Sequence, residues 1–366
     1  MSTFVLMAGG TGGHLFPAMA LAQELQRRGH IIHLMTDHRV ASYGDAFPAR
    51  EIHVVPSATP SVGNPLVFAI AAAKILWGTA VAWQKLRAIK PDAVIGFGGY
   101  PVFPPFLAAR LSGVPGILHE QNAVMGRANR ALGRFASRIA LSFATTQHAD
   151  AFPGKTVLTG NPVRDRVRNV ASSGYRPFDA DGPIRLVVFG GSQGARAFAN
   201  LVPPAIAELS PEIRARLRIV QQCRPEDLDR VAEAYRKAKV SVELQAFFSD
   251  LPERIAACHL VISRAGASTI AELTVLGRPA ILVPLPGSID GDQKNNAQVV
   301  DAAGGGWIAE QATLSPLSLA TRLSSLFGDP TILATAAAAA KTLGQPQAVE
   351  QLAGLAEGLA QGKHTT

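Results

Sequence analysis

Short apolar segments rich in β-branched residues alternate with longer amphipathic segments along this chain, and that alternation constrains the fold more than any other feature. The chain begins with a strand-like run at Phe4–Ala8, a helical pattern at Pro17–Arg28 that Gly29 ends, and a second run at Ile31–Met35. Runs this apolar are typical of strands buried on both faces, as in parallel sheets covered by helices. We therefore expect repeated β-α-β units.

The expected strands form two series. The first series continues with runs at Ala93–Phe97, Gly116–His119 and Arg138–Ser142. The second series consists of runs at Arg185–Phe189, Leu217–Gln221, Ser241–Gln245, Leu260–Ser263 and Ala280–Pro284. Between the two series, the segment Gly160–Pro183 is rich in Pro, Gly, Ser and Asp. Such a composition is typical of a linker, and we expect one there.

Each series opens with a strand followed by a glycine loop, GGTGGH at Gly9–His14 and GGSQGA at Gly190–Ala195. Two such units predict an α/β fold of two Rossmann-like, doubly wound parallel-sheet domains that face one another across a cleft. A length of 366 residues fits two domains. We expect them at residues 1–163 and 164–343, with a C-terminal helix at about 344–362 that packs back on the first domain.

Composition narrows the class of protein. Hydrophobic residues make up 48% and charged residues 17%, which excludes a disordered chain. The two cysteines, Cys223 and Cys258, are too few for a disulfide scaffold or a four-cysteine zinc site and fit a reducing compartment. A net charge of +8 favours an anionic partner. We expect no nucleic acid, because no basic stripe with interleaved aromatic residues is found.

One apolar stretch, Pro65–Trp83, is a candidate for contact with lipid. Lys74 interrupts it and it falls short of the roughly 20 apolar residues of a spanning helix, so we expect it not to cross a membrane. With the basic residues Lys85, Arg87 and Lys90 after it, the stretch is suited to lie on an anionic inner-membrane surface. The alternative is a buried helix with a solvated basic end. We expect Met1–Ala8 to be a first strand and not an export signal, because the segment has no basic residues and leads directly into a glycine loop.

The first glycine loop is suited to an anion, because glycines allow close backbone approach and the following helix N-terminus carries partial positive charge. A dinucleotide fingerprint fits poorly, since Leu15 stands where its third glycine belongs, although Asp37 lies where a ribose-binding acid would. His14 at the helix start is a candidate general base. The alternatives are a tight turn without a ligand and a capping or solvated histidine.

Three further segments carry chemistry. In GGSQGAR, Ser192 and backbone amides can bind phosphate, and in SRAGASTIAE, Arg264 precedes a second helix start that is open to an anion. Glu272 lies about one turn into that helix, where a carboxylate can hydrogen-bond a ribose; the alternative is an ordinary surface acid. HEQN, with Glu120, follows an expected strand at its carboxyl end, where parallel sheets bind ligands. Glu120 is a candidate acid, base or structural partner of the loop after it.

Taken together, GGTGGH, GFGGY, HEQN, GNPVR, GGSQGAR, SRAGASTIAE and the DxDQ…NA segment resemble, in order and spacing, the family of cytoplasmic N-acetylglucosaminyltransferases of peptidoglycan synthesis. The resemblance covers nearly the whole chain from Phe4. It implies a GT-B fold whose C-terminal domain binds UDP-N-acetylglucosamine. The N-terminal domain binds undecaprenyl-diphosphate-N-acetylmuramoyl-pentapeptide, and the product has a β-1,4 linkage. It also implies peripheral association with the cytoplasmic face of the inner membrane.

The resemblance also implies roles for particular residues. In the first domain, Thr11, Gly12 and Gly13 match a loop that reaches a diphosphate, and Asn122 and Arg164 match donor-contacting positions near the cleft. In the second domain, Ser192 matches a diphosphate contact and Phe248 a uracil-side position. The start of the donor-binding helix matches Ala267, Ser268 and Thr269, with Glu272 on the ribose, and Gln293 matches the amide that orients the sugar hydroxyls.

Inverting transfer needs a base that takes the proton of the acceptor hydroxyl, and a means of stabilising the departing UDP. We expect His14 as the base, with Glu120 second. Helix termini and glycine-loop amides can hold a diphosphate, so no cofactor or metal is expected, and the pairs Asp179/Asp181 and Asp290/Asp292 are interpreted as solvated acids. Two other functions fit less well: a UDP-N-acetylglucosamine 2-epimerase, and a non-catalytic binding subunit.

Overall fold

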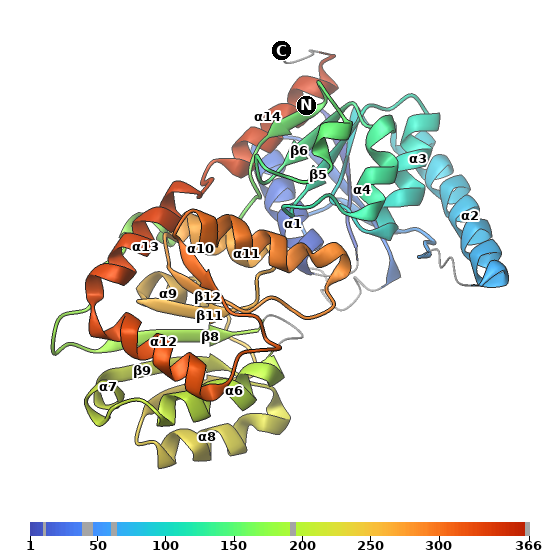
Figure 1. The fold of residues 1–366 in the computed structure, drawn as a ribbon. Helices are drawn as coiled ribbons and strands as arrows, with labels where there is room; N and C mark the ends of the chain where they lie inside the picture. The colour runs from blue at the N-terminus through green and yellow to red at the C-terminus, as the bar shows by residue number, and fades with distance from the viewer. Residues whose placement is uncertain (10–11, 39–46, 60–63, 191–194, 363–366) are drawn as a thin grey trace. The chain divides into compact units, whose positions relative to one another are not determined.

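The computed structural model describes all residues except 10–11, 39–46, 60–63, 191–194 and 363–366. The chain forms two compact units (Figure 1). Unit 1 comprises Met1–Arg164 together with Pro346–Thr366, and unit 2 comprises Asp165–Gln345. Each contains one fully parallel sheet. The predicted pair of doubly wound α/β domains is therefore confirmed.

The sheet of unit 1 has seven strands in the order β3-β2-β1-β4-β5-β6-β7. Their bounds are Glu51–Val54, Ile31–Thr36, Thr3–Met7, Ala93–Gly96, Gly116–Glu120, Arg138–Leu141 and Thr156–Leu158. The chain reverses its direction of progress across the sheet between β1 and β4. At such a switch point, the loops that follow neighbouring strands diverge and leave room for a ligand.

Helices cover both faces of this sheet. α1 (Gly12–Arg27) packs with α14 (Ala348–Ala360) over one face, where Leu21 and Leu352 share a buried core. On the other face lie α2 (Pro65–Ile89), α3 (Phe103–Leu111) and α4 (Arg127–Leu132), whose apolar side chains pack on β1, β4 and β5. Further short helices among the described residues of unit 1 are Tyr100–Val102, Gly133–Phe135 and Ala149–Ala151.

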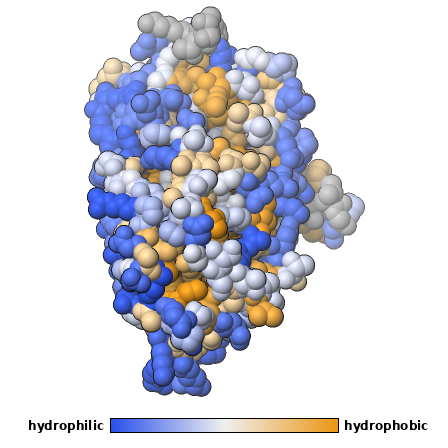
Figure 2. Space-filling model, turned by 60° about the vertical axis from the view of Figure 1, so that its left-hand side comes forward, coloured by the Kyte–Doolittle hydropathy of each residue, from blue (hydrophilic) through white to orange (hydrophobic). Residues whose placement is uncertain are grey.

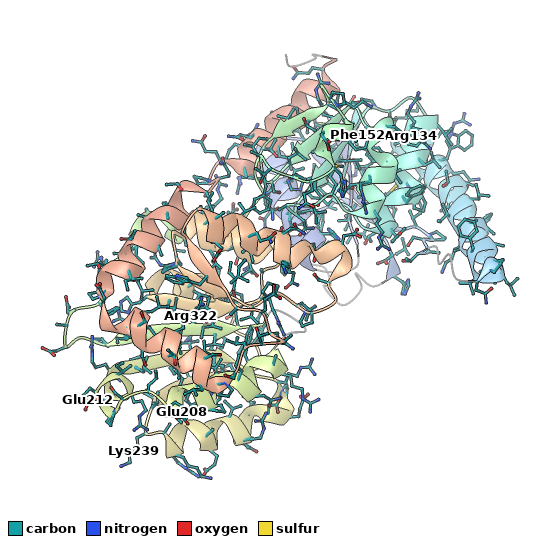
Figure 3. The ribbon with its side chains drawn as sticks, in the orientation of Figure 1. Arg134, Phe152, Glu208, Glu212, Lys239 and Arg322 are labelled. Atoms are coloured by element: carbon teal, nitrogen blue, oxygen red, sulfur yellow. The ribbon has the colours of Figure 1, made fainter. Side chains whose placement is uncertain are left out.

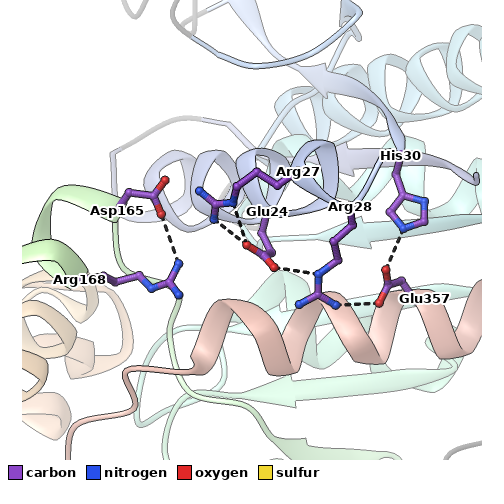
Figure 4. A network of polar contacts seen from close by, with 7 residues as sticks. All are labelled: Glu24, Arg27, Arg28, His30, Asp165, Arg168 and Glu357. Atoms are coloured by element: carbon purple, nitrogen blue, oxygen red, sulfur yellow. Dashed lines mark hydrogen bonds and ion pairs between the residues drawn. The ribbon is translucent and has the colours of Figure 1, made fainter.

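An ion-pair network joins α14 to the end of α1 (Figure 4). Glu357 of α14 accepts hydrogen bonds from Arg28 and His30, each at 2.8 Å. Arg28 also bonds Glu24, which pairs with Arg27 one turn from the helix end. Burial opposes ionisation of Glu357, but the bonds from His30 and Arg28 outweigh it and lower the pKa of this carboxyl. The C-terminal helix is thus tied to unit 1 by charge as well as by apolar packing.

Helix α2 differs from its sequence expectation. It runs for 25 residues, beyond the expected end at Trp83, and by length and composition alone it is long and apolar enough to span a membrane. Its start is fixed by Asn64, whose side chain accepts from the Leu66 amide at 2.9 Å. Gly78 allows close packing, because a Cβ there would lie 1.9 Å from the carbonyl oxygen of Pro56. The helix is therefore longer than the sequence predicted, and whether it crosses a membrane stays a prediction.

The sheet of unit 2 has six strands in the order β10-β9-β8-β11-β12-β13, the Rossmann order. Their bounds are Ser241–Gln245, Leu217–Gln222, Ile184–Phe189, Leu260–Ser263, Ala280–Leu282 and Gly306–Ile308. α6 (Ala195–Ala207) packs against α8 (Leu228–Lys237) and α12 (Pro316–Gly328). α10 (Ala267–Leu276) packs against α5 (Asp165–Val170), α9 (Leu251–Ala257), α11 (Asp292–Ala302) and α13 (Pro330–Thr342). α7 is Pro211–Arg216, and the short helices are Ala171–Ser173, Pro225–Asp227 and Ile289–Gly291.

The segment expected to be a linker is partly helical. Within Gly160–Pro183, α5 forms at Asp165–Val170 and packs on α9 and α10. Arg168 pairs with Asp165 at 3.3 Å within this helix (Figure 4). The turn-forming residues that suggested a linker are concentrated at Gly160–Pro162 and after Ser173, so the prediction was wrong for the residues between them.

Glu212 and Lys239 lie where β9 and β10 begin, at the edge of unit 2 opposite the carboxyl ends of its strands (Figure 3). The face in Figure 2 is mainly polar, and its apolar side chains form separate patches. That face therefore presents no single continuous apolar surface.

Candidate functional site

A chain of hydrogen bonds crosses the carboxyl edge of unit 1 beside the switch point. His119, at 0% exposure in β5, bonds the Gly160 carbonyl oxygen through Nε2 at 3.0 Å. Its Nδ1 lies 3.0 Å from the side-chain nitrogen of Gln121, which also donates to the Phe97 carbonyl at 2.9 Å. Complete burial lowers the pKa of His119 to about 4, so the ring is neutral near pH 7.

The same series of hydrogen bonds fixes the tautomer of His14 at the start of α1. Because the amide nitrogen of Gln121 is committed to the Phe97 carbonyl, its oxygen Oε1 faces His14 Nδ1, 3.3 Å away. An amide oxygen only accepts, so Nδ1 of His14 is the donor and the lone pair of the neutral ring is on Nε2. The arrangement presents Nε2 as the nitrogen that can accept a proton. His14, predicted from the sequence as a base, is thus oriented by Gln121, which sequence reasoning did not single out.

The loop between β4 and the following short helix lies against the His14 ring. Gly98 and Gly99 have φ of 82° and 76°, and a Cβ on Gly99 would lie 3.4 Å from Nε2 of His14. Residues with side chains rarely adopt such angles. Pro101 of that short helix packs on Gly9, where an added Cβ would lie 2.8 Å from the proline Cβ. The GFGGY segment and the first glycine loop are therefore in direct contact.

Glu120 is held by the loop that follows β5. It is 1% exposed, and its Oε1 accepts from the Asn122 amide at 3.0 Å and the Asn122 side chain at 3.4 Å. Its Oε2 accepts from the Gly126 amide at 2.9 Å and from Asn129 at 2.8 Å. Burial raises the pKa of this carboxyl, although those hydrogen bonds act in the opposite direction. These contacts favour the structural alternative that the sequence left open for Glu120.

The other predicted residues of unit 1 lie around this edge. Gly12 and Gly13 begin α1, and Asn122 is half-buried in the loop after β5. The Arg164 guanidinium lies 5.1 Å from the centroid of the Phe16 ring. Thr11 is outside the described residues.

Two buried amides at this edge were missed by sequence reasoning. Asn129 bonds Glu120 and the His119 carbonyl, while its own Oδ1 has no hydrogen-bond partner in the described part of the chain. Asn161, 5% exposed, has both polar side-chain atoms buried without a partner there. Unsatisfied buried amides are costly and uncommon. Asn161 stands in the GNPVR motif, so its place in a motif was the available signal.

In unit 2 the equivalent edge is formed by the loops after β8, β11 and β12. α10 begins at Ala267 behind Gly266, which makes no side-chain cap, and a Cβ on Gly266 would meet no atom of the described residues within 4 Å. The backbone N–H groups of the first turn, at Ala267, Ser268 and Thr269, are of the kind that a helix leaves without partners inside the helix. The Ser268 hydroxyl is buried with no hydrogen-bond partner among the described residues. Glu272 is 7% exposed on the same helix.

Arg264 is held by hydrogen bonds within unit 2. It is 7% exposed, and its guanidinium donates to the carbonyl oxygens of Val283 at 3.1 Å and Pro284 at 3.2 Å, and to Gln311 at 2.7 Å. Burial lowers the pKa of this group. Arg264 thereby joins the ends of β11 and β12 and supports the loop that precedes α10.

Residues from α11 complete this edge. Gln293 accepts from the Leu285 amide at 2.9 Å, which places its amide group at the end of β12. Asn296, at 0% exposure, donates to the Ala265 carbonyl at 3.1 Å and so holds the approach to α10. Sequence reasoning did not single out Asn296, although it lies in the DxDQ…NA motif.

Phe248, the residue that the resemblance matched to a uracil-side position, has a buried ring. Phe248 is 5% exposed, and the Arg254 guanidinium covers it at 4.6 Å from the centroid. The neighbouring Phe247 is 73% exposed just beyond the end of β10. Ser192 is outside the described residues.

Each unit thus presents glycine turns and helix starts at the carboxyl edge of its sheet, and unit 1 adds an oriented histidine. Such features can bind phosphate groups and accept a proton.

The comparisons with known proteins agree on one family. The N-terminal domain of glycosyltransferase family 28 matches residues 4–141, and the C-terminal domain of that family matches residues 185–352. A relative from Allorhizobium ampelinum is named UDP-N-acetylglucosamine--N-acetylmuramyl-(pentapeptide) pyrophosphoryl-undecaprenol N-acetylglucosamine transferase. It is 50% identical over 360 residues, which cover 98% of this chain and 96% of the relative.

Solved structures agree with the fold. The crystal structure of Acinetobacter baumannii MurG has a TM-score of 0.79 and 30% identity, and the match covers 97% of this chain and 99% of that one. A UDP-GlcNAc 2-epimerase from Neisseria meningitidis, solved bound to UDP-GlcNAc, has a TM-score of 0.65 at 15% identity over 95% of this chain and 98% of that one. That likeness shows the fold alone.

Proposed function

This chain belongs to glycosyltransferase family 28, and we propose that it transfers N-acetylglucosamine from UDP-N-acetylglucosamine to the 4-hydroxyl of undecaprenyl-diphosphate-N-acetylmuramoyl-pentapeptide. The product is a β-1,4-linked, lipid-linked disaccharide. The relatives' names support this choice of substrates, and the identity extends over both domains of the chain.

The observation that carries the proposal is the orientation of His14. In the transfer, the acceptor oxygen attacks the anomeric carbon while the bond from that carbon to the UDP oxygen breaks. The departing oxygen keeps the electron pair, and Nε2 of His14 takes the hydroxyl proton. Gln121 holds Nδ1 of the ring at 3.3 Å and so stabilises the imidazolium that forms. Glu120 acts as a positioning residue, because its carboxylate is occupied by the loop that carries Asn122.

Unit 2 is the proposed donor-binding domain. The backbone amides at the start of α10 bind the diphosphate, and Glu272 on the same helix bonds the ribose. Gln293 orients the sugar hydroxyls. The exposed ring of Phe247 is better suited than the buried Phe248 to stack on uracil.

Unit 1 is the proposed acceptor-binding domain, and α2 is its proposed lipid contact. α2 exposes large apolar side chains along most of its length: Leu66, Val67, Phe68, Ile70, Leu76, Trp77 and Trp83. Basic residues Lys85, Arg87 and Lys90 follow at its C-terminal end. This combination fits peripheral association with anionic lipids at the cytoplasmic face of the inner membrane.

The deciding experiment measures UDP release from UDP-N-acetylglucosamine with and without a short-chain lipid-linked muramoyl-pentapeptide. We expect release that depends on the acceptor, with the disaccharide as product, and its loss in His14→Ala. Binding of the donor without release in the presence of acceptor would contradict the proposal. Formation of the manno-epimer without acceptor would instead identify an epimerase.

A further inference from the structure

Two buried histidines face one another on strands β2 and β3 of unit 1. Nδ1 of His33 lies 3.2 Å from Nε2 of His53, and the rings stack with centroids 5.4 Å apart and planes 15° apart. His33 is 9% exposed and His53 is 5% exposed. The pair is part of the one group of three or more potential metal ligands found among the described residues, and its third member is Glu51.

The register of the two strands produces this arrangement. His33 pairs with Glu51 and Met35 pairs with His53 in the parallel ladder. Side chains two positions apart point to the same face of a sheet, so all four lie on one face. β3 is an edge strand, and Glu51 is 63% exposed, which leaves a route from solvent to the pair.

We propose that His33 and His53 bind one divalent transition-metal ion of the Zn²⁺ class between β2 and β3, with Glu51 as the outer partner of His53. Zinc–imidazole bonds of about 2.0–2.1 Å in a tetrahedral site place two ligand nitrogens about 3.3 Å apart. The observed 3.2 Å separation is close to that value. Water molecules supply the remaining ligands at the exposed edge.

The second ring nitrogen of His53 already has the partner that a metal-bound histidine needs. Nδ1 of His53 lies 3.3 Å from a carboxylate oxygen of Glu51. A carboxylate that accepts from the outer nitrogen of a ligating histidine fixes the ring orientation and strengthens metal binding. Without metal, one proton lies between His33 and His53. When the metal binds, that proton moves to Nδ1 of His53, which then donates a hydrogen bond to the Glu51 carboxylate. The pair therefore loses no net proton.

Lys85 of α2 opposes the metal. Its Nζ lies 3.5 Å from Nδ1 of His53, where it donates to the metal-free ring, and its charge repels a cation. Arg50 is the other cation that acts on this pair, and Glu51 is the opposing anion. Burial lowers the pKa of both histidines, so both rings are neutral near pH 7, the state in which imidazole ligates metals.

The ligand set also selects the ion. Imidazole suits Zn²⁺, Co²⁺, Ni²⁺ and Cu²⁺, whereas Mg²⁺ and Ca²⁺ prefer oxygen ligands. The pair lies in the middle of β2 and in β3, outside the glycine loops and helix starts assigned above to the transfer reaction. The histidines are therefore separate from the groups proposed for the transfer reaction, and the test of the site does not use activity.

The test uses the full chain without a polyhistidine tag, titrated with ZnCl2 by calorimetry and with CoCl2 by visible absorbance. We expect one Zn²⁺ per chain and a Co²⁺ spectrum of a low-coordinate nitrogen site. His33→Gln and His53→Gln should each weaken binding at least tenfold, and Glu51→Gln should weaken it about 10- to 100-fold. MgCl2 should produce no binding heat.

Two further variants keep the proposal falsifiable if a histidine variant fails to fold. Lys85→Gln removes the competing cation and should tighten Zn²⁺ binding several-fold, a result that a purely structural histidine pair does not predict. His148→Asn, at an exposed histidine with φ of 66°, is the control and should change nothing. Unchanged Zn²⁺ affinity in Lys85→Gln and Glu51→Gln, or undiminished binding in both histidine variants, would overturn the proposal.

Discussion

Oε1 of Gln121 lies 3.3 Å from Nδ1 of His14, and this contact determines which nitrogen of the histidine can act as a base. Gln121 is 1% exposed and bonds Phe97 and His119 through its amide nitrogen, so it cannot rotate without losing those bonds. The side chain acts as a rigid support for His14. The relationship leads directly to the first prediction.

Replacing His14 by Ala should lower kcat about 10²- to 10⁴-fold, the range expected for loss of a general base. The donor KM should change little, because His14 belongs to unit 1. Steady-state kinetics with acceptor-dependent UDP release measures both. A kcat within tenfold of the unaltered protein would remove His14 from the mechanism.

Gln121 is expected to act through His14. Gln121→Met should reduce kcat about 10- to 100-fold with a smaller effect on either KM. Gln121→Glu places a carboxylate at Nδ1, which favours the imidazolium and should move the acidic limb of the pH–kcat profile to higher pH. A loss of kcat in Gln121→Glu with an unshifted limb would indicate a structural role alone.

Glu120 should affect stability before chemistry. Glu120→Gln replaces one acceptor oxygen by an NH2 group that faces two donors, at a cost of about 1–3 kcal/mol for each unsatisfied group. We therefore expect a lower Tm together with a lower kcat. A variant with unchanged Tm and abolished turnover would instead assign Glu120 a direct proton-transfer role.

Glu272 should determine affinity for the donor. Glu272→Gln is expected to raise the KM for UDP-N-acetylglucosamine about 10- to 100-fold, as for loss of a hydrogen bond to a charged group. The acceptor KM should stay the same. Thr274→Val is the matched control on the same helix, because its hydroxyl donates to the Ile270 carbonyl at 2.9 Å; it should leave the donor KM within about threefold. A rise in donor KM in Thr274→Val as large as that in Glu272→Gln would show that the effect comes from the helix and not from the carboxylate.

The apolar side chains of α2 should govern binding to vesicles. Leu76→Ser combined with Trp77→Ser removes two exposed apolar groups, each worth about 1.5–3 kcal/mol when buried, and should reduce partition to anionic vesicles at least tenfold. Leu317→Ser is a matched control, since Leu317 is 66% exposed and Leu76 is 67% exposed. Equal sedimentation of the two variants would exclude α2 as the lipid contact.

His119 should destabilise the protein in acid. Its pKa is about 4 when folded and about 6.5 when unfolded, so between these values the unfolded chain binds a proton that the folded chain does not. The contribution of the neutral His119 ring to the free energy of unfolding is complete above pH 6.5. It decreases as the pH falls toward 4, by roughly 3 kcal/mol at most. An NMR titration of the imidazole should show a neutral ring down to about pH 5. Protonation near pH 6.5 in the folded protein would contradict this.

Several features followed from local pattern. The apolar strands were predicted because both faces of a parallel strand are buried, which leaves a continuous apolar run. The strands β3, β7 and β13 were missed, since EIHV contains two polar residues and the other two strands have only three residues each. Edge strands bury less surface and so leave a weaker signal.

The sequence by itself determined the alternation of strands and helices, the glycine turns, the charge and the family motifs, because these depend on residues near one another in the chain. The tertiary structure decided what each polar side chain contacts. It turned Arg264 toward the carbonyls after β12, enclosed Glu120 in its own loop and oriented His14 through Gln121, which is 107 positions away. It also brought His33 against His53. Hydrogen bonds between distant segments depend on strand order and register, and no local pattern encodes those.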